Sequence, residues 1–178
     1  MTAEKSTVLV AYASKMGETR GIAETIGAEP TAAGLTVTVR AAGEVRSLDG
    51  YDAVVLGSAI YSSRWRHEAV DVLELLADNS DALQPIPTWL FHSGPCGDKA
   101  TDQISAPKKV TTYARRIGTA PPVTFGGRLQ PATATGFLAR KMAAGPLAGD
   151  FRDFARIRAF AEGIAHQLTT PKPDVIWR

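Results

Sequence analysis

Disulfide chemistry is the first thing that the sequence lacks. Cys96 is the single cysteine among 178 residues, so the chain cannot form an internal disulfide, which is typical of proteins in a reducing cytoplasm. A membrane span is also missing, because no apolar run reaches about 20 residues. The first residues, MTAEKST, lack the apolar core of a signal peptide. We therefore expect a cytoplasmic protein.

Two further absences limit the chemistry. The three histidines, His67, His92 and His166, do not have the spacing of metal ligands, so no metal site is predicted. The net charge of +2 and the pI of about 8.8 do not demand a nucleic-acid partner. What remains is a chain of globular composition, long enough to bury a sizeable core.

Positive charge is unevenly distributed along the chain. Basic residues are concentrated in its later middle, at Lys108, Lys109, Arg115, Arg116, Arg128, Arg140 and Lys141. A solvated surface explains most such groups of charges. The functional alternative is attraction of an acidic substrate or of anionic lipid.

The stretch TVLVAYASKMGET, Thr7–Thr19, joins a run of β-forming residues to a short polar loop, and a helical periodicity of apolar residues follows. The start of a helix presents free backbone N–H groups and the positive end of the helix dipole, which favour an anion. Ser14 and Thr19 add hydroxyl donors, and Gly17 allows a tight turn. The loop contains neither GxxxxGKS/T nor GxGxxG, so an ordinary capped turn is the alternative to a phosphate site.

Four later segments are predicted as strands. Residues 35–40 alternate between apolar and polar side chains, which is typical of a strand at a sheet edge. Residues 53–57 and 88–91 do not alternate, so we expect both to be buried on two faces. The first of these is expected to end in the turn Gly57-Ser58-Ala59. Residues 123–127 form the last predicted strand.

Helical periodicity predicts four main helices. The first follows the polar loop and is expected to end or kink at Pro30. The second is expected to open at Trp65. The third begins at Ser105–Pro107 and is closed by Gly118. Asp153 is the expected N-cap of the last helix.

This alternation predicts an α/β fold class with a doubly wound parallel sheet of five strands, in the order 2-1-3-4-5, and helices on both faces. Ligands bind such sheets at the carboxyl ends of strands one and three, where the winding direction changes. Three loops meet there: Ser14–Thr19, Ser58–Trp65 and His92–Asp98. We expect one domain over residues 1–170, an insertion with a short amphipathic helix at 128–150, and a tail at 171–178.

Motifs in all three loops point to one family. The hydroxyl-flanked glycine loop, GSAIYSSRW at 57–65 and HSGPCGD at 92–98 together resemble the flavodoxin family. Within that family the chain is most similar to the menaquinone-dependent protoporphyrinogen dehydrogenases. The resemblance covers nearly the whole chain, including GGRL at 126–129 and the closing helix at 151–168. It implies a flavodoxin-like fold and FMN as the cofactor.

By this resemblance each loop has a part in FMN binding. The first would hold the phosphate, the second would flank the isoalloxazine ring with Tyr61 or Trp65, and the third would offer backbone groups to the ring edge. The expected contacts are Ser14, Lys15, Met16, Gly17, Glu18, Thr19, Ser58, Ala59, Ile60, Tyr61, Trp65, Ser93 and Gly94. The chain departs from electron-carrying flavodoxins at Met16, where they have a hydroxyl residue, and in lacking their strongly acidic balance.

The resemblance further implies an FMN-dependent oxidoreductase that oxidises protoporphyrinogen IX and reduces a quinone. A substrate with two propionates would suit the basic excess, and the insertion could contact the inner face of a membrane. No catalytic acid, base or nucleophile is assigned, and Cys96 is interpreted as a bystander. His92 is interpreted as a structural residue, with contact to the flavin or the substrate as the alternative. Two alternatives are an electron-transfer flavodoxin that serves a redox partner protein, and a flavodoxin-like domain that has lost FMN.

Overall fold

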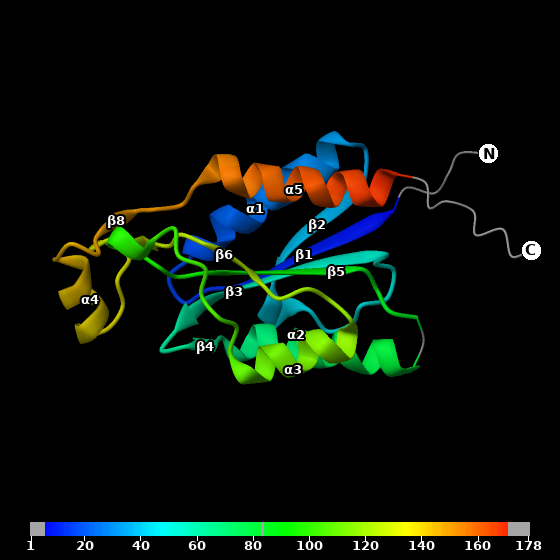
Figure 1. The fold of residues 1–178 in the computed structure, drawn as a ribbon, viewed down its shortest axis with the longest axis horizontal. Coiled ribbons are helices and arrows are strands. Elements are labelled where there is room, and N and C mark those ends of the chain that lie inside the picture. Colours follow the sequence, from blue (N-terminus) through cyan, green and yellow to red (C-terminus); the bar gives the residue numbers. More distant parts are fainter. Residues whose placement is uncertain (1–5, 83, 171–178) are drawn as a thin grey trace, which may run out of the picture.

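A parallel sheet between two layers of helices forms the centre of the computed structural model, which describes residues 6–82 and 84–170 (Figure 1). The sheet has the order β2-β1-β3-β5-β6, with β4 as a short antiparallel extension of β3. The predicted α/β class and the order 2-1-3-4-5 are therefore confirmed. The strands are β1 (Thr7–Ala13), β2 (Thr36–Ala41), β3 (Ala53–Tyr61), β4 (Arg64–Trp65), β5 (Thr88–Ser93) and β6 (Val123–Phe125).

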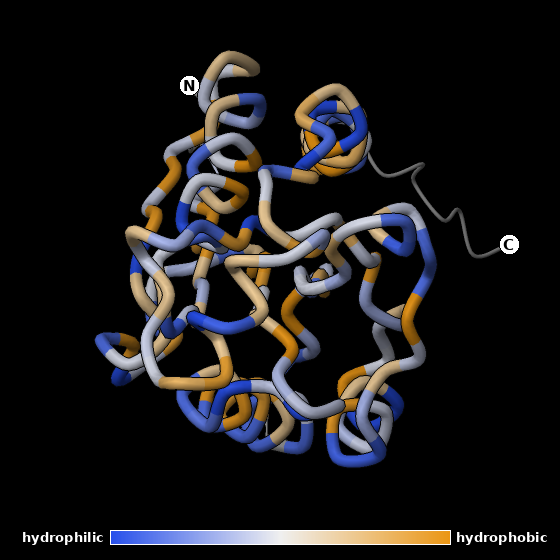
Figure 2. The backbone as a smooth tube through the Cα atoms, turned by 90° about the vertical axis from the view of Figure 1, so that its left-hand side faces the viewer, coloured by the Kyte–Doolittle hydropathy of each residue, from blue (hydrophilic) through white to orange (hydrophobic). Residues whose placement is uncertain are grey.

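Two pairs of helices cover the sheet. One face carries α1 (Glu18–Ala32) and α5 (Phe154–Thr169), and the other carries α2 (His67–Ala82) and α3 (Lys108–Ile117). In the end view of Figure 2 the helices lie above and below the sheet, and hydrophobic segments gather between the two layers. Two short 3-10 helices, η1 (Ala42–Glu44) and η2 (Gly97–Lys99), lie in the loops after β2 and β5.

Strand β1 shows why the centre of the sheet is apolar on both faces. Val8 and Val10 pack in the cluster beneath α1 and α5, whereas Leu9 and Ala11 pack in the cluster beneath α2 and α3. All four side chains have no exposed surface. Because successive residues of a strand point to opposite faces, an uninterrupted apolar run is what a doubly covered strand requires.

Strand β3 is longer than predicted. It does not turn at Gly57 but continues to Tyr61, because its end keeps pairing with β5 up to Ala59. The chain then reverses through Ser62 and Ser63, which have positive φ angles of 48° and 57°, and returns as β4. The expectation that Trp65 opens a helix is wrong, since this residue lies in β4 and α2 begins two residues later.

The helix ends follow local signals in most places. The Asp153 carboxylate accepts a hydrogen bond from the Arg156 N–H at 3.0 Å, as expected of an N-cap. Gly118 ends α3 in the left-handed conformation, with φ of 79°. Pro30 does not end α1, since it lies inside the helix, which continues to Ala32. The N-cap position of α3 is Pro107, and Ser105 provides no cap there.

Residues 128–150 form a small unit beyond the carboxyl ends of the strands. The antiparallel strands β7 (Arg128–Leu129) and β8 (Gly149–Asp150) enclose the short helix α4 (Phe137–Ala143), at the left of Figure 1. The short helix predicted within this insertion is confirmed. No helix within residues 6–82 and 84–170 combines the length and apolarity of a membrane span. The tail predicted at 171–178 lies outside the described residues.

Candidate functional site

A cavity of about 840 Å³ opens at the carboxyl ends of β1, β3 and β5. Its volume lies within the range of roughly 300–1,000 Å³ that is typical of small-molecule sites. The walls come from the loop after β1, the β3–β4 hairpin, the segment after β5 and the insertion. The three loops that the sequence assigns to one ligand therefore do surround one cavity, and the insertion supplies a further wall.

Most of the expected contact residues line this cavity, and three do not. The Ser58 side chain is fully buried, where its hydroxyl accepts from the Arg66 N–H at 2.9 Å and donates to the Ala59 carbonyl. Ser14 and Gly17 shape the first loop from outside the lining. The expected residues that do line the cavity are Lys15, Met16, Glu18, Thr19, Ala59, Ile60, Tyr61, Trp65, Ser93 and Gly94.

The first loop has the geometry of an anion cradle. Gly17 adopts a φ of 82°, and its N–H donates to the Ser14 hydroxyl oxygen at 2.9 Å, which closes the turn before α1. Among the described residues, the backbone N–H groups of Met16, Glu18 and Thr19 have no acceptor. Because they lie at the positive end of α1, they are available to an anionic group.

The hydroxyl groups that the sequence offered as anion donors have partners within the protein. Ser14 Oγ donates to the Glu18 carboxylate at 3.4 Å. Thr19 has no exposed surface, and its Oγ1 lies 3.1 Å from Ser93 Oγ, which ties the start of α1 to the end of β5. The backbone is therefore the principal donor set of this loop, and the hydroxyls fix its shape.

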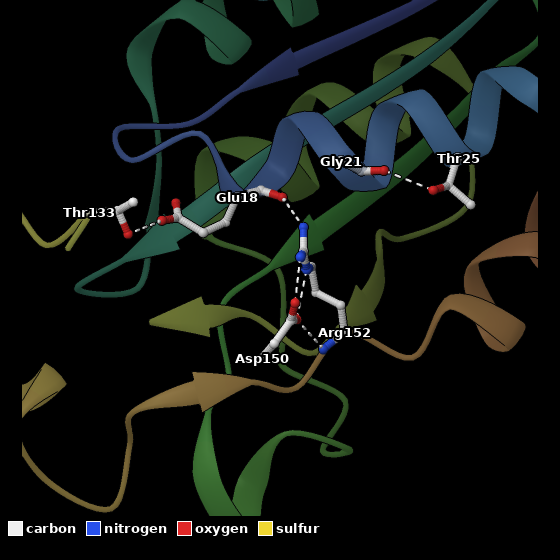
Figure 3. Close-up of polar contacts among 6 residues, drawn as sticks. All are labelled: Glu18, Gly21, Thr25, Thr133, Asp150 and Arg152. Atoms are coloured by element: carbon white, nitrogen blue, oxygen red, sulfur yellow. Dashed lines mark hydrogen bonds and ion pairs between the residues drawn. The ribbon is translucent and has the colours of Figure 1, made fainter. Parts of the chain in front are cut away.

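Glu18 brings a negative charge into the cradle. Its side chain is 5% exposed, and its carboxylate accepts from the Thr133 hydroxyl at 3.4 Å. Its backbone carbonyl accepts from Arg152 Nη1 at 3.3 Å, and Arg152 Nε also donates to Asp150 at 2.8 Å (Figure 3). The start of α1 is thus connected to β8 and to the middle of the insertion.

The position of Met16 explains why the first loop has no hydroxyl there. Met16 packs against a small cluster whose buried members are Leu129, Ala134 and Ala143, all from the insertion. A hydroxyl side chain would remove apolar surface from this contact. The departure from the family pattern therefore coincides with the contact between the loop and residues 128–150.

The two aromatic candidates have different roles. Trp65 is 7% exposed, and its Nε1–H donates to His92 Nδ1 at 3.3 Å, so its indole is held in place. Tyr61 is half-buried, and burial, followed by the nearby Glu18 carboxylate, raises the pKa of its hydroxyl. Tyr61 is therefore the aromatic that presents more of its surface to the cavity, and it stays protonated at neutral pH.

His92 is a structural residue behind the cavity wall. It has no exposed surface, and burial lowers the pKa of its imidazole to about 4, so the ring is neutral at physiological pH. Since Nδ1 accepts from Trp65, the proton resides on Nε2, which donates to Thr124 Oγ1 at 2.7 Å. The interpretation of His92 as structural agrees with this network.

Four cationic side chains line the cavity, and two of them, Arg64 and Arg66, were not assigned to it from the sequence. Lys15, Arg64, Arg66 and Arg128 face it, against the single carboxylate of Glu18. The sequence did not identify Arg64 and Arg66 as cavity residues, because the two-residue strand β4 is too short to produce a periodic pattern of apolar residues. Among the basic residues concentrated in the later middle of the chain, only Arg128 lines the cavity. The exposed remainder is Lys108, Lys109, Arg115, Arg116, Arg140 and Lys141.

Cys96 lines the cavity but is not activated. Its side chain is half-buried, and burial, together with the nearby Glu18 carboxylate, raises the pKa of its thiol. A raised pKa leaves the thiol protonated and weakly nucleophilic at neutral pH. Cys96 therefore serves as part of the wall, in agreement with its interpretation as a bystander.

Comparisons with known proteins agree with this architecture. A family model described as a flavodoxin domain matches residues 9–142. A flavodoxin from the domain Archaea is 17% identical over 92% of this chain and 99% of its own, with a TM-score of 0.61. Flavodoxin 2 from Bacillus cereus is 18% identical over 91% of this chain and 99% of its own, with a TM-score of 0.61.

A larger protein contains a similar unit. The flavodiiron core Flv1 from Synechocystis is 16% identical over 93% of this chain and 36% of its own, with a TM-score of 0.65. No match is found among curated proteins. At these identities the likeness to solved structures concerns the fold, whereas the family model covers most of the chain.

Proposed function

The chain belongs to the flavodoxin family, and from this premise we propose that it is a flavin oxidoreductase with a small-molecule substrate of its own. FMN is the cofactor that the family implies, and the residues fit it. The free N–H groups at the start of α1 suit its phosphate, and Tyr61 with the apolar residues Ala59 and Ile60 suits its ring. When bound, FMN supplies hydride or electron transfer.

One observation carries the proposal: the cavity extends past the cofactor loops onto helix α4. Phe137, Leu138 and Met142 line it, and they are 86%, 69% and 41% exposed. Large apolar side chains gathered at the mouth of a cavity are typical of a ligand-binding surface. A carrier that passes electrons from an exposed ring edge has no need of such an extension.

The charge of the lining supports an anionic substrate. Lys15, Arg64 and Arg128 face the cavity without an ion pair among the described residues, whereas Arg66 is paired with Glu68. Since Glu18 is the one carboxylate among the lining residues, the excess of positive charge attracts acidic molecules. We propose protoporphyrinogen IX as the donor, since it combines an apolar body with propionates, and a quinone as the acceptor. The role of the protein is to bind, orient and shield, because His92 is buried and neutral and Tyr61 stays protonated.

Helix α4 also supports contact with a membrane surface. Phe137 and Leu138 are exposed next to the basic residues Arg140 and Lys141, and the helix has no acidic residue. Apolar side chains beside positive charge favour the surface of an anionic bilayer. We propose that this contact gives a lipid-dissolved quinone access to the cavity.

Anaerobic turnover tests the proposal. FMN-loaded protein should oxidise protoporphyrinogen with menadione as the acceptor. Replacing Phe137 and Leu138 together by Ser should raise KM for the porphyrinogen without lowering FMN affinity. Val39→Thr is the matched control, because Val39 is an exposed apolar residue, at 38%, outside the cavity.

Electron transfer to a partner protein is the competing function. Reduced protein that delivers electrons to a protein acceptor but never turns over porphyrinogen or quinone would establish it. Purified protein that is colourless and shows no binding in a titration with FMN would exclude both functions and leave a domain that has lost its cofactor.

A further inference from the structure

Arg128 is a cation without a partner among the residues that the structure describes. It lies on β7, is half-buried and lines the cavity. Its Nε is buried and has no hydrogen-bond acceptor, and its guanidinium joins none of the ion pairs of the described residues. A buried charged donor without an acceptor is unfavourable, so this group is expected to meet an acceptor when a ligand fills the cavity.

Two other partly buried arginines near the site are differently placed. Arg152 donates to Asp150 and to the Glu18 carbonyl (Figure 3). Arg66, whose Nε also lacks an acceptor, donates through Nη2 to Glu68 at 2.9 Å. Their charges are thus offset by carboxylates in direct ion pairs. Arg128 makes no such pair among the described residues, and its charge acts on Asp150 only at longer range, where it adds to the larger effect of Arg152 in lowering the pKa of that carboxyl.

Two contacts fix β7 beside the cradle of the first loop. Leu129, which follows Arg128, packs in the cluster that contains Met16. Asp150, which pairs with Arg128 across the β7–β8 ladder, is held by Arg152 at the start of α1. Met16, Glu18 and Arg128 line the same cavity, so an anion on the free N–H groups of the cradle would lie in the cavity that Arg128 faces.

The charge balance of the cradle calls for an added cation. Glu18 already contributes a buried negative charge there, and Asp150 with Arg152 forms a pair of no net charge. A phosphate monoester adds nearly two further negative charges. A guanidinium can bind a phosphate through two parallel N–H donors, and it does so more strongly than a neutral donor.

We propose that Arg128 binds the phosphate group of the ligand held by the first loop, so that the insertion contributes directly to the cofactor site. This inference rests on the proposed function only in taking FMN as that ligand. The chemical class recognised is a phosphate monoester. Arg128 thereby links residues 128–150 to cofactor retention and not to the substrate alone.

Affinities for FMN and riboflavin, measured by quenching of flavin fluorescence, test the inference because riboflavin lacks the phosphate. Arg128→Gln should weaken FMN binding about 10- to 100-fold and leave riboflavin binding within about twofold. Arg128→Lys should recover part of the loss, since it restores the charge without the planar fork. Lys141→Gln removes an exposed charge from the same insertion, outside the lining, and should change neither affinity.

The outcomes separate this inference from the proposed function. Equal losses for FMN and riboflavin, or no loss for either, overturn the role of Arg128 at the phosphate. Wild-type protein that binds FMN no better than riboflavin overturns it as well. An FMN-specific loss in a protein that turns over no porphyrinogen supports this inference and removes the enzymatic proposal.

Discussion

The central sheet and the insertion at 128–150 differ in how far their apolar side chains are exposed to solvent. Along β1 four successive residues, 8–11, have no exposed surface, whereas α4 leaves Phe137 and Leu138 mostly exposed. The buried cluster of the insertion consists of one leucine and two alanines, joined by partly buried neighbours such as Met16. The sheet therefore provides most of the hydrophobic stabilisation, and the insertion leaves large apolar side chains exposed.

This difference in burial indicates at which positions the folded protein tolerates a substitution. A residue that is packed on both sides cannot be altered without disturbing its neighbours, whereas an exposed apolar residue contributes little to folding and much to binding. The following predictions test that division, beginning with the largest expected effect.

Truncation of one phenylalanine in each region gives the sharpest contrast. Phe91 has no exposed surface and packs in the cluster of α1 and α5. Phe91→Ala should lower the free energy of unfolding by about 3–5 kcal/mol. Phe137→Ala should change it by no more than about 0.5 kcal/mol. Urea denaturation measures both, and similar losses would contradict the division.

Acid should destabilise the sheet through His92. The pKa of this imidazole is about 4 in the folded protein, against 6.5 for an unperturbed histidine, so the unfolded chain binds the additional proton. Stability should therefore decrease as the pH falls from about 6.5 towards 4, by about 3 kcal/mol for this group. The difference in unfolding free energy between wild type and His92→Gln isolates it, and a pH-independent difference would refute the assignment.

Substitution of one glycine in the sheet and one in the insertion compares how tightly the two regions are packed. A Cβ at Gly57 would lie 2.0 Å from the Phe91 ring, whereas one at Gly145 would lie 3.7 Å from its nearest neighbour, the Met142 carbonyl oxygen. Gly57→Ala should destabilise by about 1–3 kcal/mol. Gly145→Ala should be neutral or stabilise by up to about 1 kcal/mol, because it restricts the unfolded chain. Thermal unfolding ranks the two, and a reversed order would break the comparison.

Met16 tests the contact between the cradle and the insertion. Met16→Ser restores a hydroxyl but removes apolar surface from the cluster with Leu129, so it should destabilise by about 1–2 kcal/mol. FMN affinity should not improve. Hydrogen exchange should report faster opening of residues 128–150, while Met16→Leu retains protection. Tighter FMN binding in the Ser variant would mean that packing does not explain the methionine.

Glu18 is expected to have the smallest effect. Glu18→Gln removes a buried negative charge from the cradle but keeps an acceptor for the Thr133 hydroxyl. FMN affinity should rise about fivefold, corresponding to about 1 kcal/mol, and riboflavin affinity should stay constant. A fall in FMN affinity would show that the carboxylate supports the cofactor.

The order of the elements could be predicted from local patterns, and the end of β3 could not. Uninterrupted apolar runs mark buried strands, and right-handed crossovers leave few orders for a parallel sheet. The N-cap at Asp153 and the C-cap at Gly118 are likewise encoded within a few residues. The turn expected at Gly57 was wrong because pairing with β5, more than thirty residues away, extends the strand.

The candidate site also has features that the local sequence encodes and features that depend on distant contacts. Glycine and hydroxyl residues before a helix are sufficient to predict the cradle, because the helix start itself creates the anion-binding N–H groups. The sequence alone therefore determined the sheet, its order and the position of the loop whose backbone N–H groups are left free at the start of α1. Tertiary structure decided which side chains complete the site, since Met16 meets Leu129 and Trp65 meets His92 only after folding. The physical reason is that hydrophobic periodicity records which face of an element is buried, but not which distant side chain will lie against it.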